Sequence, residues 1–146
     1  MTQVDFYILK ESEEQDRLVF ACRLTEKAMN QGLKIHIHTS DEQTAQDMDD
    51  LLWSFRPDSF IPHAIVGIDE ELTEDEDIPV FIGFGEQVQA QSIDLLINLG
   101  TEIPAGHEGF SRIAEIVRNA EEPKARLREH WNSYKAKGFE LKHHQL

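Results

Sequence analysis

Short apolar segments alternate with helical patterns over the first 55 residues, and this order constrains the fold more than any other feature. Residues 4–9 are rich in β-favouring apolar side chains and residues 34–39 alternate between polar and apolar ones, so both predict strands. Residues 18–29 and 45–55 instead repeat apolar side chains at the spacing of one helix face. A strand–helix–strand–helix order predicts a βαβ unit and hence a parallel sheet.

The sequence also marks where these two helices begin and end. Ser12 stands before Glu13 and Glu14, which is a capping-box-like start for the first helix. Gly32 is expected to stop that helix, because glycine readily takes the backbone conformation that follows a last helical turn. Asp41 or Ser40 is expected to cap the second helix.

The second half of the chain carries further strand and helix patterns. Short apolar runs predict three more strands, within 60–66 (interrupted at Pro62), at 80–84 and at 95–99. Residues 110–117 are predicted to form the apolar side of a third major helix, and Pro123 is predicted to begin a fourth. We found no internal repeat and no low-complexity linker, so residues 1–146 are assigned to a single α/β domain of three layers with a mostly parallel sheet.

Composition excludes several functional classes. Acidic side chains number 28 against 14 basic ones, which gives a formal charge of −14, so a phosphate backbone repels the chain unless its cations are segregated. The single cysteine, Cys22, excludes an intramolecular disulfide and predicts an inert, packed thiol. The sequence has neither a membrane-spanning run nor a secretory pattern, so we expect a cytoplasmic protein.

A nucleotide-binding topology invites a search for a phosphate-binding loop, and none is found. The stretch after the first predicted strand, Lys10 to Glu14, contains no glycine and carries three glutamates, which would repel a phosphate. Gly83 and Gly85 lack the third glycine and the strand-to-helix context of a dinucleotide motif, so a hairpin or loop is favoured there. The sequence therefore predicts a nucleotide-binding-like topology without the phosphate loop, no cofactor and no catalytic site.

Histidine pairs raise the question of a metal site. His36 and His38 fall on one side of a predicted strand, where they could supply two ligands. No third ligand stands nearby in sequence, so solvated histidines at a strand end are favoured and no metal is expected. His143 and His144 are predicted to lie at a frayed terminus and to bind nothing.

An aromatic segment follows the second predicted helix. Trp53, Phe55 and Phe60 stand close to Pro57 and Pro62 at a helix-to-loop junction. An exposed aromatic cluster there would serve as an anchor for a partner protein. In the alternative, Trp53 and Phe60 fill the core while the loop turns at Pro57. Spacing alone leaves both interpretations open.

Cations are segregated near the C-terminus. Residues 123–142 contain six Lys or Arg against two acids, in a chain of charge −14. The residues on one face of the predicted helix are Lys124, Arg128, Trp131 and Lys135. Arginine can hold a carboxylate through two hydrogen bonds, so this face suits an acidic peptide. A solvated basic helix face is the alternative.

Several motifs recur together along the chain, from its start to its end. They are Phe6-Tyr7-Ile8-Leu9, Leu51-Leu52-Trp53, Ser59-Phe60-Ile61-Pro62-His63, Leu95 to Leu99, and the helix from Ala125 that ends at Tyr134-Lys135 and Gly138-Phe139. Together they resemble the chi subunit family of bacterial DNA polymerase III, and the resemblance spans nearly the whole chain.

This resemblance implies a non-catalytic role in the clamp-loader assembly of DNA replication, with two protein partners. The psi subunit would contact an aromatic region formed by Trp53, Phe55, Pro57 and Phe60. The acidic C-terminal tail of single-stranded DNA-binding protein would bind a pocket formed by Val117, Lys124, Arg128, Trp131, Asn132 and Lys135.

The chain departs from the family pattern at several positions. Trp131 stands where a tyrosine can occur, and Asn132 stands where a lysine can occur and so removes one charge. The segment 69–77, with seven acidic residues in nine, matches no family motif; it is expected to be a solvated loop that tail binding does not need.

Two other functions fit parts of the sequence. A small nucleotide-binding α/β enzyme would suit the predicted topology, but its phosphate loop is missing. A direct binder of single-stranded DNA could use Trp131 on the basic face, but the overall charge opposes it.

Overall fold

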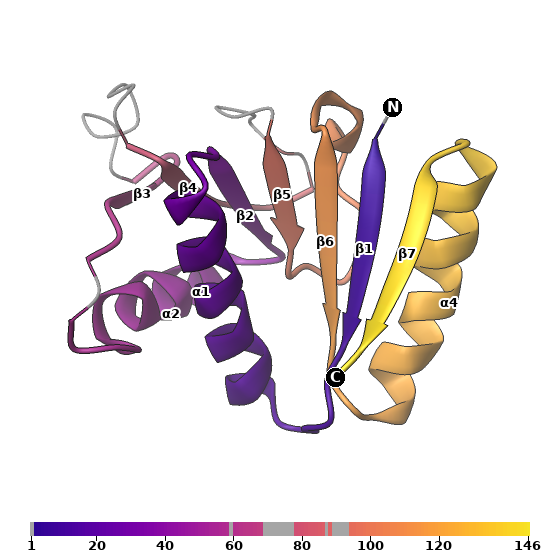
Figure 1. Cartoon of the computed structure of the whole chain (residues 1–146), viewed down its shortest axis with the longest axis horizontal. Coiled ribbons are helices and arrows are strands. Elements are labelled where there is room, and N and C mark those ends of the chain that lie inside the picture. Colours follow the sequence, from indigo (N-terminus) through magenta and orange to yellow (C-terminus); the bar gives the residue numbers. More distant parts are fainter. Residues whose placement is uncertain (1, 59, 69–77, 87, 89–93) are drawn as a thin grey trace.

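A seven-stranded parallel sheet organises the part of the chain that the computed structural model describes, which is residues 2–58, 60–68, 78–86, 88 and 94–146 (Figure 1). The elements in chain order are β1 (Gln3–Ile8), α1 (Glu14–Asn30), β2 (Ile35–Thr39), α2 (Glu42–Ser54), β3 (His63–Ile65), β4 (Val80–Phe84), β5 (Leu95–Asn98), the 3₁₀ helix η1 (His107–Gly109), β6 (Arg112–Val117), α4 (Glu121–Ala136) and β7 (Glu140–Gln145). The strand order is β3-β4-β2-β5-β6-β1-β7. The expected α/β class is confirmed.

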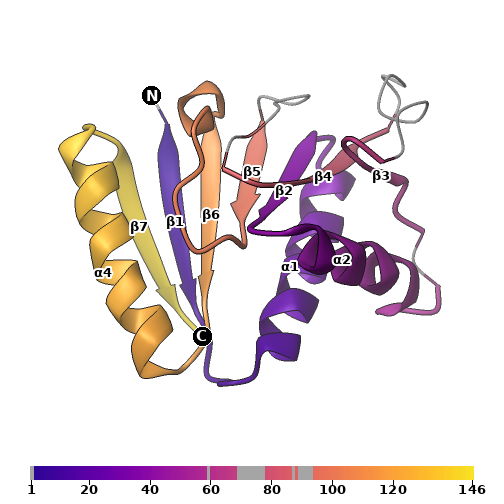
Figure 2. The same cartoon turned by 180° about the vertical axis from the view of Figure 1, so that it is seen from behind.

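Helices cover the two faces of this sheet (Figures 1 and 2). Side chains alternate along each strand, so Tyr7 and Ile116 pack on the face of α1 and α2, whereas Phe6 and Ile113 pack on the face of α4. Each face therefore has its own apolar core, and the sheet is the middle layer of three. Among the described helices, none is both long and apolar enough to cross a membrane.

The ends of α1 and α2 test the predicted caps. Gly32 follows α1 with a positive φ of 82° and donates its N–H to the Met29 carbonyl, so it stops the helix as predicted. Asp41 caps α2 by accepting the Thr44 N–H at 2.8 Å. The predicted Ser12 cap is wrong, because Glu13 occupies the N-cap position of α1 and makes no side-chain cap bond.

Cys22 lies buried in α1, and burial raises its pKa to about 12. The thiol therefore stays protonated and packs as an apolar side chain, as predicted. Three other predicted strands are also present as β3, β4 and β5. The acidic segment 69–77 lies outside the described residues.

The predicted helix at 110–117 is wrong, since these residues contribute β6. β6 lies between β5 and β1 and is covered on both faces, so its apolar side chains Ile113, Ala114, Ile116 and Val117 do not show the alternation of a half-buried strand. The resulting spacing also fits one face of a helix, so periodicity could not separate a buried strand from a helix here.

The predicted frayed terminus is also wrong. Residues 140–145 form β7, which pairs with β1 along its whole length. His144 hydrogen-bonds Asp5 at 2.9 Å and stacks on Tyr7 with ring centroids 4.9 Å apart. These contacts tie the end of the chain to its beginning.

His36 and His38 are buried, so the prediction of solvated histidines is wrong. Burial, followed by the neighbouring His38, lowers the pKa of His36 to about 3. Gly83 in β4 pairs with this region, and a Cβ at Gly83 would lie only 2.8 Å from Nε2 of His36. Gly83 is therefore a packing glycine inside a strand, and it has no phosphate-loop role in this fold.

Replacing Gly83 by alanine should destabilise the fold, because the added methyl group overlaps a buried ring that has little room to move. We expect Gly83→Ala to lower the free energy of unfolding by about 1–3 kcal/mol, measured by urea denaturation. Gly109→Ala is the matched control, since nothing lies within 4 Å of its Cβ position. Equal stability of the two variants would contradict the packing argument.

Candidate protein-docking surfaces

Helix α4 presents the cationic residues singled out in the sequence, and a buried stripe fixes it on the sheet. Pro123, His130 and Tyr134 are buried against the strands beneath. Glu121 and Glu122 occupy its first turn and Lys135 its last, the arrangement that the helix dipole favours. The predicted start at Pro123 is thus correct to within two residues.

A buried carboxylate in β6 attaches α4 to the sheet. Glu115 accepts hydrogen bonds from Asn98 Nδ2 at 2.8 Å, from the Tyr134 hydroxyl at 2.6 Å and from His130 Nδ1 at 3.0 Å. Asn98 belongs to β5, whereas the other two donors belong to α4. One carboxylate therefore joins three elements, and its desolvation is compensated by three donors.

The two partners of His130 favour its protonated, imidazolium form. Nδ1 faces the Glu115 carboxylate and Nε2 lies 3.1 Å from the Thr101 carbonyl oxygen, so both ring nitrogens face acceptors. Burial lowers the pKa of His130, but the hydrogen bond and charge of Glu115, with smaller effects of Thr101 and Glu102, raise it overall. Burial and the Glu115 charge also raise the pKa of Tyr134, which stays a neutral donor.

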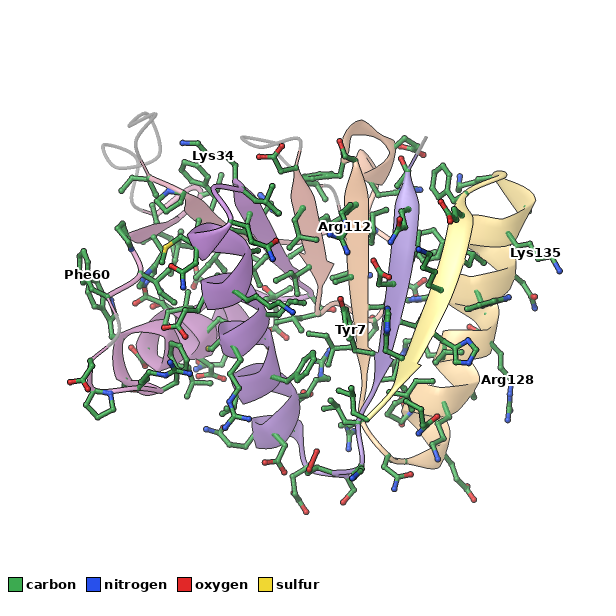
Figure 3. All side chains as sticks on the ribbon, in the orientation of Figure 1. Tyr7, Lys34, Phe60, Arg112, Arg128 and Lys135 are labelled. Carbon is green, nitrogen blue, oxygen red and sulfur yellow. The ribbon has the colours of Figure 1, made fainter. Side chains whose placement is uncertain are left out.

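The docking face of α4, defined as Lys124, Arg128, Trp131, Asn132 and Lys135, lies beside the buried stripe. Its polar members are exposed, and the side chains of Arg128 and Lys135 point away from the sheet (Figure 3). Within the described residues, none of its three cations makes an ion pair. Trp131 is half-buried, with its ring 5.3 Å from that of Phe6. The face thus combines available cations with one fixed aromatic side chain.

Val117 does not lie on this face. It ends β6 beneath α4, is only 5% exposed, and belongs to the same apolar cluster as Trp131 and Leu127. The structure therefore gathers five of the six predicted tail-binding residues on one helix face and places the sixth below the helix. From there Val117 supports the Trp131 region from within the core.

The aromatic surface, defined as Trp53, Pro57 and Phe60, lies where α2 leads into β3. Trp53 is 52% exposed and Phe60 65% exposed, so the alternative in which they fill the core is wrong. Their ring centroids lie 5.5 Å apart. Pro57 is also exposed, whereas Phe55 is half-buried and packs against the core.

Buried polar contacts fix the base of the aromatic surface. The His63 ring lies 4.8 Å from that of Trp53, and its nitrogens hydrogen-bond the Ile61 carbonyl and the Asp49 carboxylate. The aromatic surface adjoins β3 and the docking face adjoins β7, which are the two edge strands of the sheet (Figures 1 and 3). Two partners could therefore bind without competing for space.

Sequence reasoning missed the Glu115 network. One signal was present, since Glu115 is a charged residue inside the apolar run 113–117 and would need buried donors. Its partners could not be named, because they come from positions 98, 130 and 134. A search of the described residues finds no group of three or more His, Cys, Asp or Glu side chains suited to a metal ion.

Comparisons with known proteins agree with one family. The family model described as DNA polymerase III chi subunit, HolC, matches residues 1–142. A Pseudomonas aeruginosa protein named DNA polymerase III subunit chi is 41% identical, over 100% of this chain and 98% of its own length. Proteins of the same name from Haemophilus influenzae (93% of this chain, 92% of its own) and Escherichia coli K12 (97% and 96%) are 32% and 26% identical.

A solved structure is similar in fold alone. The C-terminal domain of the DEAD-box protein Dbp5 superposes with a TM-score of 0.62 at 13% sequence identity, covering 99% of this chain and 90% of that one. The likeness confirms the nucleotide-binding-like arrangement of strands and helices, and at this identity it carries no functional argument.

The Glu115–His130 pair predicts a pH-dependent contribution to stability. Because the pKa of His130 is raised in the fold, its contribution is fully present below the unfolded value of about 6.5 and is lost as the pH rises through the folded value. We expect His130→Gln to cost about 1.5–3 kcal/mol of unfolding free energy at pH 6 and less at pH 9.

Urea denaturation at both pH values measures this difference between wild type and variant. His143→Gln is the control, because it removes an exposed histidine from β7. A cost of His130→Gln that is the same at pH 6 and pH 9 would show that the imidazolium is not what Glu115 stabilises.

Proposed function

Because the chain belongs to the DNA polymerase III chi subunit family, we propose that it bridges two partners in the cytoplasm, the psi subunit and the acidic C-terminal tail of single-stranded DNA-binding protein. Family membership makes the chain a replication accessory subunit. The two partners, a place in the clamp-loader assembly and the lack of a catalytic site of its own are the proposal. The two separate surfaces at opposite edges of the sheet support it.

The docking face of α4 suits an acidic tail that ends in an apolar residue. Arg128 would hold the terminal carboxylate through two hydrogen bonds, since its guanidinium is exposed and outside any ion pair among the described residues. The last apolar side chain would pack against Trp131, whose ring is already fixed on Phe6. Lys124 and Lys135 would meet the acidic side chains that precede it.

The observation that carries this assignment is the set of three available cations, because the chain as a whole has a charge of −14. Several cations of the chain form intramolecular ion pairs, among them Arg17, Arg112 and Arg126. Lys124, Arg128 and Lys135 form no ion pair within the described part of the chain and lie together on one helix face. Exposed pairs with a ligand there should weaken as salt is added.

The aromatic surface supports the second partner. Two large rings more than half exposed and in mutual contact present an apolar patch that a soluble protein seldom leaves uncovered. Tryptophan and phenylalanine on a fixed base are suited to act as anchors, because little side-chain entropy is lost when a partner covers them. We assign the psi subunit to this surface, with Pro57 at its rim.

Arg128→Ala should weaken tail binding at least tenfold, because a charged hydrogen-bonding partner of the terminal carboxylate is lost. Fluorescence anisotropy of a labelled acidic tail peptide measures the affinity at two salt concentrations. Arg23→Ala removes an equal charge from the exposed side of α1, on the other face of the sheet, and should leave the affinity unchanged. An Arg128→Ala protein that binds like wild type would contradict the assignment.

Trp53→Ser combined with Phe60→Ser should weaken binding of the psi subunit by about 30-fold or more, the loss expected for an aromatic anchor. Isothermal titration calorimetry with purified psi subunit measures it. Leu146→Ser is the matched control, since it removes another exposed apolar side chain, at the β7 end of the sheet. Tail-peptide affinity should be unaffected in both proteins, so a joint loss would indicate misfolding instead of a lost anchor.

A further inference from the structure

A cavity of about 210 Å³ opens at the carboxyl ends of β5 and β6, between the first turns of α1 and α4. Its lining includes Arg17 from α1, Arg118 from the end of β6, and Arg126 and His130 from α4. We propose that this arginine cavity binds a small phosphate-type anion, such as inorganic phosphate, pyrophosphate or the phosphate group of a small molecule. The inference is independent of the two protein partners.

The arginines are held in place by the backbone around them. Arg17 donates from Nη2 to the Leu99 carbonyl at 3.1 Å, and Arg118 donates from Nη1 to the Ser12 carbonyl at 2.9 Å. A guanidinium has five N–H donors, so each of these bonds orients a side chain that keeps donors for a ligand. Such pre-oriented guanidinium groups match the geometry of phosphate oxygens.

The acids at the cavity are already engaged. Glu14 pairs with Arg17, and Glu122 pairs with Arg126 at 2.9 Å. Glu115 accepts hydrogen bonds from three donors, one of which is His130. The lining carries three arginines and an imidazolium against Glu14 and Glu115. With Glu122, the partner of Arg126, also counted, one positive charge is left over at the cavity within a chain of charge −14.

The position of the arginine cavity adds a second argument. In open parallel sheets, ligands bind outside the carboxyl ends of the strands, where the N-terminal ends of helices point their positive dipoles. The first turns of both α1 and α4 reach this cavity, and they also carry four acids, which offset part of the dipole: Glu14, Asp16, Glu121 and Glu122. Neither helix has a side-chain cap bond at its N-cap, so their first N–H groups are not taken up there.

The size of the cavity selects the ligand class. Sites for whole cofactors or drug-sized molecules are about 300–1,000 Å³, so 210 Å³ is too small for a complete nucleotide and suits a compact anion. The chain has no glycine-rich phosphate loop in its sequence, so arginine side chains would donate the hydrogen bonds to the anion in place of a loop backbone. A free anion and the phosphate end of a larger molecule share this chemistry.

The arginine cavity is separate from the docking face. On α4, Arg126 lies on one side of the buried stripe of Pro123, His130 and Tyr134, and Arg128 lies on the other. Positions two apart in an α-helix point to nearly opposite sides of its axis, so Arg126 and Arg128 lie on different flanks of α4. A bound anion would therefore not occupy the place of a tail peptide.

Isothermal titration and ³¹P NMR at fixed ionic strength test the proposal, with inorganic phosphate, pyrophosphate and adenosine monophosphate as probes and chloride as the reference anion. We expect saturable binding of phosphate and pyrophosphate, reduced at least tenfold in Arg118→Gln and in Arg126→Gln. Arg23→Gln is the matched control for lost charge and should bind like wild type. Circular dichroism establishes that each variant is folded.

The three probes separate the sources of the anion. Similar affinities for phosphate and adenosine monophosphate would identify a free anion as sufficient, whereas much tighter binding of the nucleotide would identify the phosphate end of a larger molecule. Absence of saturable binding beyond chloride would overturn the proposal. Equal binding by wild type and Arg126→Gln and Arg118→Gln would also overturn it, because the anion would then bind elsewhere.

Discussion

The Glu115 carboxylate is the group on which the position of α4 depends. It is buried in the central sheet, where an uncompensated charge would be costly, and the Asn98 amide, the Tyr134 hydroxyl and the His130 imidazolium compensate it. Because two of these donors belong to α4, the helix cannot shift or rotate without breaking bonds to a buried charge. The docking face and the arginine cavity lie on opposite flanks of this helix, so the geometry of both rests on the same carboxylate.

The sequence pattern alone predicted the helices that bury one face and expose the other. α1 and α2 bury one face each, so their apolar spacing predicts them directly. β6 was mistaken for a helix because both of its faces are buried, so Ile113, Ala114, Ile116 and Val117 lack strand alternation and match the spacing of a helix face. β7 was missed for the opposite reason: most of its side chains are polar and exposed, and its pairing with β1, nearly the full length of the chain away, holds it in place.

The candidate sites also differ in how far the sequence could predict them. The docking face could be predicted because Lys124, Arg128, Trp131 and Lys135 belong to one helix, and helical spacing alone brings them together. Exposure could not be predicted, since it depends on what covers a residue: Trp53 and Phe60 proved exposed, whereas His36, His38 and Val117 proved buried. The arginine cavity is the extreme case. Arg17 and Arg118 stand a hundred residues apart in sequence, and only the parallel pairing of β1 with β6 brings the ends of those strands to one place.

The charge distribution reconciles an acidic chain with anionic ligands. Screening at physiological salt limits electrostatic attraction to about 8 Å, so a ligand responds to the flank of α4 that it touches and hardly to the remaining charge. A long polyphosphate backbone cannot confine itself to one flank of a helix, and it would meet the acids of the chain, whose formal charge is −14. The end of a short acidic peptide, or a single compact anion, can bind to one flank of the helix alone. For the proposed function, we expect local cations to select small anionic ligands and the overall charge to oppose nucleic acid at the same surface.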